Sequence, residues 1–569
     1  MTIGGWAEIL LVLALAVLLA WPVGIHISRV AEGKRTFLHP LLAPLERIIY
    51  ALSGIDPAQE MSWQHYAFAL VALNALHFLM LYAVLRLQFY LPLNPDHLVG
   101  MSPRLAFNTA MSFVTNTNWQ AYSGETTLSP GSQMWGLTSH MFVSAATGVG
   151  AALAFSRAFA RGGLKTLGNF WVDLTRIVLY VLLPITVIAA LALVALGVPQ
   201  TLATHADTTT LEGAKQTIAM GPVAFMEAIK ELGTNGGGYF NANSAHPFEN
   251  PNAFSCILEI VLVLLIPFAL TFTFGQMVGE RRQGYVLLAV SGIFLLAAVA
   301  IAYSAEAHGN PLLTTLGVDP TQGNMEGKEL RFGIPLSVLF NVVTTATSCG
   351  AVNAMLDSYM PLGGLVSMFL MQLGEVVPGG VGSGLYGLIV FALLAVFLAG
   401  LMVGRTPEYL GKKIQAKEVK LAMLAVLILP LSILGGTALS LALPEARASL
   451  AVGGPHGLSE MLYAFTSATA NNGSAFAGIS ADTPWLDTTL GIAMLLGRYA
   501  FLVPVLAIAG SLAEKAKVPA SSGTFPTDRP LFVGLLCGVI FIVGGLQFMP
   551  ALSLGPLAEH FVLFAGKSF

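Results

Sequence analysis

The chain has 569 residues, of which 55% are hydrophobic and 10% are charged, and its formal net charge is −3 at pH 7. A mean hydropathy of +0.74 excludes an ordinary soluble globular protein, and the near-neutral charge gives no basis for binding nucleic acid. Apolar runs long enough to cross about 30 Å of hydrocarbon recur along the whole chain. The composition therefore predicts an all-α polytopic membrane protein.

The apolar runs predict about ten transmembrane helices. The first run, 9–27, has no Lys or Arg before it, whereas basic residues follow it, so we expect a true span rather than a secretory signal peptide. With the N-terminus outside, most of the 27 basic residues fall in cytoplasmic loops, as the positive-inside rule requires. The approximate centres of the ten spans are Leu18, Leu76, Val143, Leu183, Val263, Val290, Phe391, Ala425, Ala500 and Phe541.

Four shorter stretches on the predicted outer side resemble one another. Each has a proline near its start, where a helix tolerates the missing N–H, and each ends in a polar turn rich in Gly and Asn. When Gly236, Gly350 and Gly473 are aligned with Asn118, the turns recur every 114 to 123 residues. Such a period indicates repeated structure. The four prolines are Pro103, Pro222, Pro335 and Pro455, and the turns end the stretches FVTNTNWQ (113–120), ELGTNGGGYF (231–240), TTATSCGAVN (344–353) and SATANNGSAF (467–476).

Each unit therefore reads as a span, a half-helix, a polar turn and a second span. Four such units predict a pseudo-fourfold arrangement with two flanking helices. The expected segments are 1–62 (first transmembrane helix and cytoplasmic loop), 63–157 (repeat one), 168–277 (repeat two), 284–404 (repeat three, with a broken second helix), 419–511 (repeat four) and 526–549 (last transmembrane helix).

The polar turns carry the chemical prediction. An unpaired backbone amide or carbonyl costs several kcal/mol in hydrocarbon, so irregular backbone at membrane depth is expected only inside protein or along a water-filled path. Carbonyls that gather there replace the hydration shell of a cation, and the negative ends of the half-helices favour a cation too. The turns hold no Asp or Glu, which favours a monovalent ion. Close packing of small residues is the alternative, but it does not explain four turns at one period.

Three stretches give the sequence a specific resemblance: GTNGGGYFNANSAHPFENP (233–251), TSCGAVNAM (347–355) and SATANNGSAFAGI (467–479). Over essentially its whole length the chain resembles the potassium-binding A subunit of the Kdp potassium-transporting P-type ATPase of bacteria and archaea. The resemblance implies a channel-like subunit that selects potassium ions from outside, with Gln120 as a further position tied to potassium affinity. The implied selectivity-filter residues are Asn116, Thr117, Asn118, Thr234, Asn235, Gly236, Ser348, Cys349, Gly350, Asn471, Asn472 and Gly473.

The seventh span is interrupted by MFLMQLGEVVPGGVGSGLYG (368–387), which contains Pro378, Gly379 and Gly380. A proline-kinked helix is one interpretation, but the glycines favour an intramembrane loop that lines a cavity beneath the turns. The superfamily that the chain resembles has a gate or constriction there. Glu375, in this loop, is either a hydrogen-bonded structural residue or a station for a cation. Arg498, inside the ninth span, is expected to block leakage and to pair with Glu375 in a closed state.

The chain has neither a G-x-x-x-x-G-K-[ST] phosphate loop nor an Asp-Lys-Thr-Gly stretch, so we expect no nucleotide on this chain and no ATP hydrolysis by it alone. The resemblance implies three partners, a P-type ATPase subunit and two small membrane subunits, in the lipid of a bacterial or archaeal cytoplasmic (inner) membrane. A stand-alone potassium or sodium transporter driven by the membrane potential is the alternative. An intramembrane enzyme is disfavoured, because its only candidate pair, His246 and Glu249, lies in an outer loop with the wrong spacing for a helical zinc site.

Overall fold

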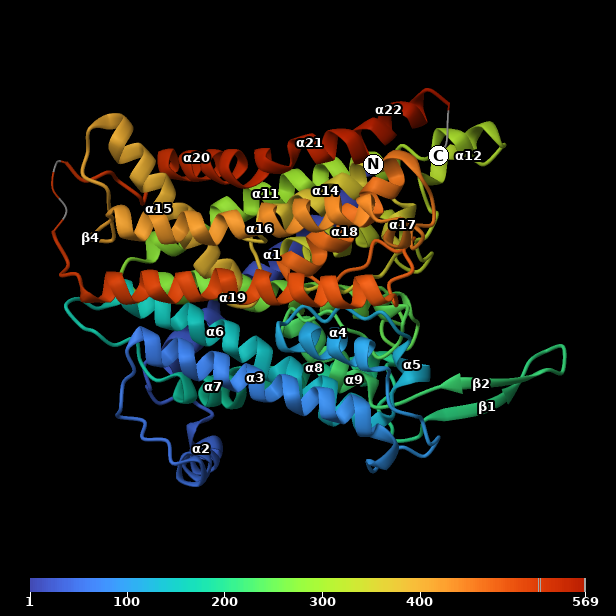
Figure 1. Cartoon of the computed structure of the whole chain (residues 1–569), viewed down its shortest axis with the longest axis horizontal. Helices are drawn as coiled ribbons and strands as arrows, with labels where there is room; N and C mark the ends of the chain where they lie inside the picture. The colour runs from blue at the N-terminus through green and yellow to red at the C-terminus, as the bar shows by residue number, and fades with distance from the viewer. Residues whose placement is uncertain (520, 522, 567–569) are drawn as a thin grey trace.

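The structure is a computed structural model that describes residues 1–519, 521 and 523–566, and it consists mainly of helices (Figure 1). In this described part, ten helices are long and apolar enough to cross a membrane, and all ten predicted centres lie within them. The all-α polytopic fold is therefore confirmed. The spans are α1 (Ile3–Ala31), α3 (Trp63–Leu87), α6 (Ser139–Ala160), α7 with α8 (Phe170–Ile177 and Leu183–Leu196), α10 (Ala253–Met277), α11 (Arg281–Ala307), α15 (Ser383–Val403), α16 (Ala416–Ala442), α19 (Pro484–Glu514) and α20 with α21 and α22 (Pro530–Val539, Met549–Leu552 and Ala558–Phe564).

Shorter elements connect the spans. Two small antiparallel hairpins are formed by β1 (His205–Thr209) with β2 (Lys215–Ala219) and by β3 (Glu408–Tyr409) with β4 (Lys412–Lys413). In Figure 1 the β1–β2 hairpin projects from the end of the bundle at which the N-terminus lies. Apart from the four half-helices, the connecting α-helices of the described part are α2 (His39–Ser53), α5 (Gly124–Thr127), α12 (Pro311–Thr315), α14 (Pro361–Gln372) and α17 (Pro444–Arg447).

The four half-helices are present, each near its predicted proline. Pro103 is the first residue of its half-helix, and Ser102 caps that helix by accepting a hydrogen bond from the Leu105 amide at 3.3 Å. Because proline has no N–H to lose in a first turn, these starts follow from the sequence. The half-helices are α4 (Pro103–Val114), α9 (Val223–Leu232), α13 (Gly333–Ala346) and α18 (Gly454–Ala470).

The order span, half-helix, span occurs four times along the chain, as α3–α4–α6, α8–α9–α10, α11–α13–α15 and α16–α18–α19. The exact residue boundaries of the repeats stay a prediction. The first flanking helix, α1, packs along α10, where Thr273 donates a hydrogen bond to the carbonyl of Gly24 at 3.0 Å. A side chain at Gly24 would collide with the carbonyl of Ala269, so this glycine permits the close approach of the two helices.

The second helix of repeat three is broken, as the sequence predicts. It consists of α14, which ends at Gln372, and α15, which begins at Ser383. Between them the backbone turns at glycines in the left-handed region, including Gly374 (φ +86°), Gly379 (φ +80°) and Gly382 (φ +86°). Residues with a side chain rarely adopt such angles, which explains why the break is rich in glycine.

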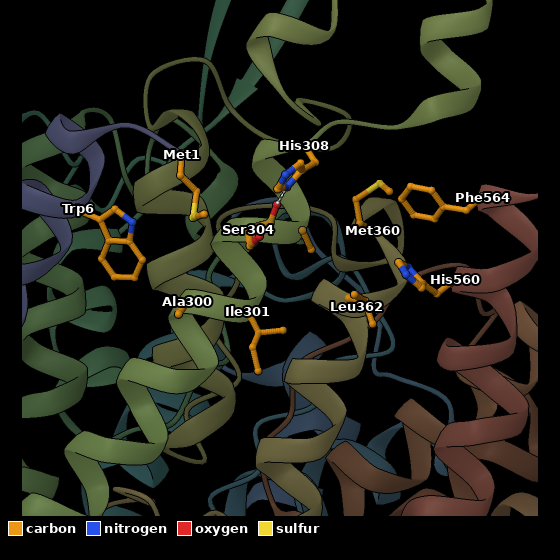
Figure 2. A pocket seen from close by; sticks show the side chains of 11 residues that line it. Met1, Trp6, Ala300, Ile301, Ser304, His308, Met360, Leu362, His560 and Phe564 are labelled. Atoms are coloured by element: carbon orange, nitrogen blue, oxygen red, sulfur yellow. Dashed lines mark hydrogen bonds between the residues drawn. The ribbon is translucent and has the colours of Figure 1, made fainter.

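An apolar pocket of about 510 Å³ separates α22 from the ends of α1 and α11 (Figure 2). Trp6, Ile301, Met360 and Phe564 are among the side chains that line it. Most of its lining is apolar, with Ser304, His308 and His560 as its polar members, and it contains no carboxylate. The candidate ion site is therefore sought at the polar turns.

Candidate ion-binding site

The four polar turns share one backbone conformation. They consist of residues 116–118, 234–236, 348–350 and 471–473. In each turn the first and third residues lie in the left-handed region. The third residue is glycine in three turns and Asn118 in the first turn. A left-handed conformation costs about 1–2 kcal/mol for a residue with a side chain, so its recurrence at non-glycine positions indicates a constrained, functional backbone. The φ values of the pairs are +66° and +56° (Asn116, Asn118), +44° and +88° (Thr234, Gly236), +55° and +81° (Ser348, Gly350) and +62° and +92° (Asn471, Gly473).

The same hydrogen bond ends all four half-helices. The amide of the middle turn residue donates to the carbonyl five residues earlier, which together with the preceding left-handed residue forms a Schellman C-cap. This cap satisfies helix carbonyls and leaves the next part of the backbone free to turn inward. The four bonds run from Thr117 to Ser112 (2.9 Å), from Asn235 to Lys230 (2.8 Å), from Cys349 to Thr344 (3.2 Å) and from Asn472 to Ser467 (2.9 Å).

The polar turns pack against one another in a ring. The glycine of each of three turns faces the backbone carbonyl of the next turn so closely that an added Cβ would lie well under 3 Å from the carbonyl oxygen. Only glycine permits this approach. The ring therefore runs through repeats two, three, four and one, and its contacts join Gly236 to Cys349, Gly350 to Asn472 and Gly473 to Thr117.

Side-chain amides close the ring between repeats one and two. Asn116 donates to the Thr234 carbonyl at 2.9 Å, and Asn235 donates back to the Asn116 side chain at 2.7 Å. Asn471 makes a similar link by donating to the Thr117 hydroxyl at 3.0 Å. The structure thus brings together all twelve turn residues named by the resemblance, and all except Gly473 are buried.

Two further polar side chains lie at the first turn. Both amide atoms of Asn118, which replaces glycine there, are buried without a hydrogen-bond partner among the described residues. Gln120 donates to the Gly238 carbonyl and to the Tyr122 hydroxyl, each at 3.1 Å. Gln120 therefore joins the segments that follow the first and second turns, consistent with a place at the entrance of the ring.

Glu375 lies directly beside the third and fourth turns. Its carboxylate accepts a hydrogen bond from Asn472 at 2.7 Å and another from the Ser348 hydroxyl, and its own backbone is left-handed, with φ +48°. The loop is fixed below the turns because the Gly379 amide donates to the carbonyl of Ala346, in α13, at 2.8 Å.

Pro378, Gly379 and Gly380 are all buried in this loop. A side chain at Gly380 would crowd Ser348 and the Thr347 carbonyl, so the loop passes close to the third turn. The structure therefore places the whole predicted gate next to the ring, although it shows no movement.

Arg498, on α19, lines a narrow cavity of about 30 Å³ together with residues of the third and fourth turns, Ser348 and Asn471. This volume is roughly that of one water molecule in the liquid. Arg498 does not pair with Glu375 in this structure, because it donates to the Ser144 carbonyl at 3.3 Å, and the pairing expected for a closed state stays a prediction. Within the described ranges, no carboxylate oxygen lies within 4.0 Å of its guanidinium, and Glu375 is already held by the two turns.

Comparison with known proteins identifies the relatives of this chain. The profile of the family described as "Potassium-transporting ATPase A subunit" matches residues 10–561. The chain belongs to this family. The "Potassium-transporting ATPase potassium-binding subunit" of Allorhizobium ampelinum is 60% identical over 569 residues and 100% of both chains, and that of Beijerinckia indica is 59% identical over 557 residues and 98% of both.

A solved structure shows the same fold at much lower sequence identity. The potassium transporter TrkH from Vibrio parahaemolyticus superimposes with a TM-score of 0.52 and 14% identity, covering 87% of this chain and 96% of that one. At this identity the likeness supports the helical fold alone.

An ionic cluster lies next to the second polar turn of this protein, and the sequence analysis did not predict it. Lys230, on α9, is fully buried and lies 2.7 Å from both Glu227 and Glu249 and 3.4 Å from Glu231. The cluster reaches the turn through Asn243, which accepts from Lys230 at 3.0 Å and donates to the Gly236 carbonyl at 2.6 Å. The sequence did contain a sign of this cluster, because Lys230 lies between Glu227 and Glu231 in an otherwise apolar half-helix.

His246 and Glu249, the one pair considered for an enzyme, do not form a metal site. Glu249 accepts hydrogen bonds from Lys230 and from the Phe240 amide, both at 2.7 Å. The His246 ring stacks on Phe240, with 3.8 Å between ring centroids. Burial lowers the pKa of His246, which favours the neutral imidazole. Both residues instead pack the segment that follows the second turn.

Proposed function

We propose that this chain is the potassium-binding, channel-like subunit of an ATP-driven, high-affinity potassium import complex. The ring of four polar turns carries the proposal. All of its residues except Gly473 are buried, its backbone is strained in the same way four times, and the turns contain no carboxylate. Neutral oxygens at the ends of four half-helices suit a dehydrated monovalent cation. The names of the curated relatives support potassium as that ion.

The potassium site in this proposal is the backbone of the polar turns. The side chains of Asn116, Asn235 and Asn471 hold neighbouring turns together, so the ion is left to the backbone carbonyls, of which those of Thr234 and Gly236 also accept a hydrogen bond from a side-chain amide. Gln120 fixes the entrance, and the loop with Glu375, Pro378, Gly379 and Gly380 forms the gate beneath the ring. Arg498 acts as a positive barrier in the cavity below.

The energy in this proposal comes from a partner. The sequence holds no phosphate loop and no phosphorylated-aspartate motif, so the chain binds no nucleotide and an ATPase subunit drives transport. Two small membrane subunits complete the complex. We place it in a bacterial or archaeal cytoplasmic membrane with the N-terminus outside, in line with the basic residues of the predicted cytoplasmic loops. The relatives' names, which refer to a potassium-transporting ATPase, support this assignment over a stand-alone transporter driven by membrane potential.

The test is the potassium dependence of ATP hydrolysis by the purified complex. We expect ATPase activity that requires this chain and is half-maximal at a potassium concentration shifted by changes in the polar turns. If the chain purifies without an ATPase subunit and carries potassium in vesicles without ATP, the stand-alone alternative is correct. If changes in the turns leave the discrimination between potassium and sodium unaltered, the ring is not the filter.

A further inference from the structure

A second group of ligand-type side chains lies outside the ring of polar turns. Asp357, in the segment that follows the third turn, meets His456 and Glu460 of α18. One ligand atom of each, an imidazole nitrogen or a carboxylate oxygen, lies within 4.8 Å of the others. His456 and Glu460 are one helical turn apart and so share a face of the helix.

The histidine is oriented as a metal ligand would be. Its Nε2 atom lies 2.8 Å from Asp357 Oδ1, while its Nδ1 atom, on the other side of the ring, lies 2.8 Å from Glu559 Oε1 of α22. Metal-binding histidines commonly donate their second ring N–H to a carboxylate in this way, which fixes the tautomer and raises the basicity of the ligand nitrogen.

Glu460 supplies an independent observation. Its side chain is 0% exposed, and in the part of the chain that the structure describes neither carboxylate oxygen makes a hydrogen bond of normal geometry, although the backbone amides of Ala451 and Val452 lie near it. A buried carboxylate without a well-formed hydrogen bond is costly, and this one lies next to Asp357 and His456. Gly478 keeps the space open, because a Cβ there would meet Glu460 and would lie 3.0 Å from both oxygens of Asp357.

The charge and the access of the group also fit a divalent cation. Three carboxylates surround one histidine, and among the described residues no Lys or Arg nitrogen lies within 4.0 Å of them, so the group is negative even when the histidine is protonated. The side chains of His456 and Asp357 are 15% and 19% exposed, which leaves an entry path from solvent.

We propose that Asp357, His456 and Glu460 bind a divalent transition-metal ion of the Zn²⁺ class, with Glu559 as the hydrogen-bond partner of the histidine. One imidazole nitrogen and two carboxylates are common zinc ligands. The ion would join three parts of the chain: the segment after the third turn, the half-helix of the fourth repeat, and the last helix. The Asp357 amide donates to the Phe476 carbonyl at 2.7 Å, so the site also braces the exit of the fourth turn.

The experiment is a titration of the purified, chelator-treated full-length chain, in its complex, with Zn²⁺. Metal content is counted per chain, and affinity is measured by calorimetry. We expect one Zn²⁺ per wild-type chain, at least tenfold weaker binding after Glu460→Gln or His456→Gln, and 10- to 100-fold weaker binding after Glu559→Gln. His205→Gln is the matched control, because His205 also faces a carboxylate, Asp96, at 3.7 Å, but in an exposed pair. It should leave the binding unchanged.

Two outcomes overturn the proposal. If the wild-type chain binds no Zn²⁺ beyond what the His456→Gln variant binds, His456 only bridges carboxylates. If Glu460→Gln retains wild-type affinity, the Glu460 carboxylate is not a ligand. The near-isosteric Asp357→Asn serves where Glu460→Gln does not yield a complex, and zinc-dependent thermal stabilisation of wild type, absent in either variant, is the second readout.

Discussion

Gly236 and Cys349, which belong to different repeats, are in direct backbone contact. The α-carbon of Gly236 faces the carbonyl oxygen of Cys349, and a Cβ built on the glycine would fall far inside van der Waals distance of that oxygen. The same relationship joins the third turn to the fourth and the fourth to the first. Because each glycine supports the carbonyl of its neighbour, the geometry of one turn depends on the others.

This dependence predicts the effect of adding one methyl group. Gly236→Ala adds both a clash with Cys349 and the strain of a left-handed alanine, which alone costs about 1–2 kcal/mol. We expect the apparent potassium affinity of ATPase activity to weaken by about tenfold or more, since 1.4 kcal/mol is a factor of ten. Gly213→Ala is the control, because Gly213 has φ +85° but no atom within 4 Å of an added Cβ. Equal effects of the two substitutions would refute the ring.

Glu375 is predicted to act through its charge. Its carboxyl group holds both Ser348 and Asn472, so the ionised form places a negative charge directly beside two of the turns. Glu375→Gln keeps the size of the side chain but removes that charge, and we expect several-fold weaker potassium affinity with normal assembly. The measurement is potassium-stimulated ATPase activity, with the exposed Glu280→Gln as the control. Unchanged affinity would make Glu375 a structural residue only.

Lys230 is predicted to be essential for folding. Removal of its charge leaves Glu227, Glu231 and Glu249 buried without a cation. Breaking such a buried network costs about 3–5 kcal/mol, so Lys230→Met should lower the yield and the melting temperature of the complex. Lys215→Met, in the exposed β1–β2 hairpin, should not. A Lys230→Met complex with wild-type melting temperature would show that the carboxylates are protonated and need no counter-ion.

Features local in sequence were predictable here, and contacts between distant segments were not. Hydropathy located the ten spans, and the glycines of the polar turns marked left-handed backbone because side chains disfavour it. The partners of Glu375 lie 27 residues away in the same repeat (Ser348) and 97 residues away in the next repeat (Asn472), and no local pattern encodes them. The pairing of Glu375 with Arg498, expected for a closed state, is absent from this structure, where Glu375 contacts Ser348 and Asn472 and Arg498 contacts the Ser144 carbonyl.

The same limit explains the ionic cluster and the proposed zinc site. Lys230 meets Glu249 only because the segment after the second turn folds back over α9. His456 meets Asp357 and Glu559 from 99 and 103 residues away. The sequence shows that these residues are charged or can bind metal. Only the assembled helix bundle brings them into contact with one another.

Arg498 is predicted to prevent passive leakage. Arg498 lines the cavity beneath the ring, and within the described ranges no carboxylate oxygen lies within 4.0 Å of its guanidinium. Two like unit charges 4 Å apart repel by about 4 kcal/mol at an effective dielectric constant of 20. Arg498→Gln should therefore raise ATP-independent rubidium flux through vesicles containing the complex, by up to about a thousandfold. Arg405→Gln is the control, because Arg405 follows α15 and donates to the Thr524 carbonyl at 3.1 Å, away from the cavity. Flux that stays at the wild-type level in Arg498→Gln, with the complex assembled, would place the barrier elsewhere, in the loop between α14 and α15.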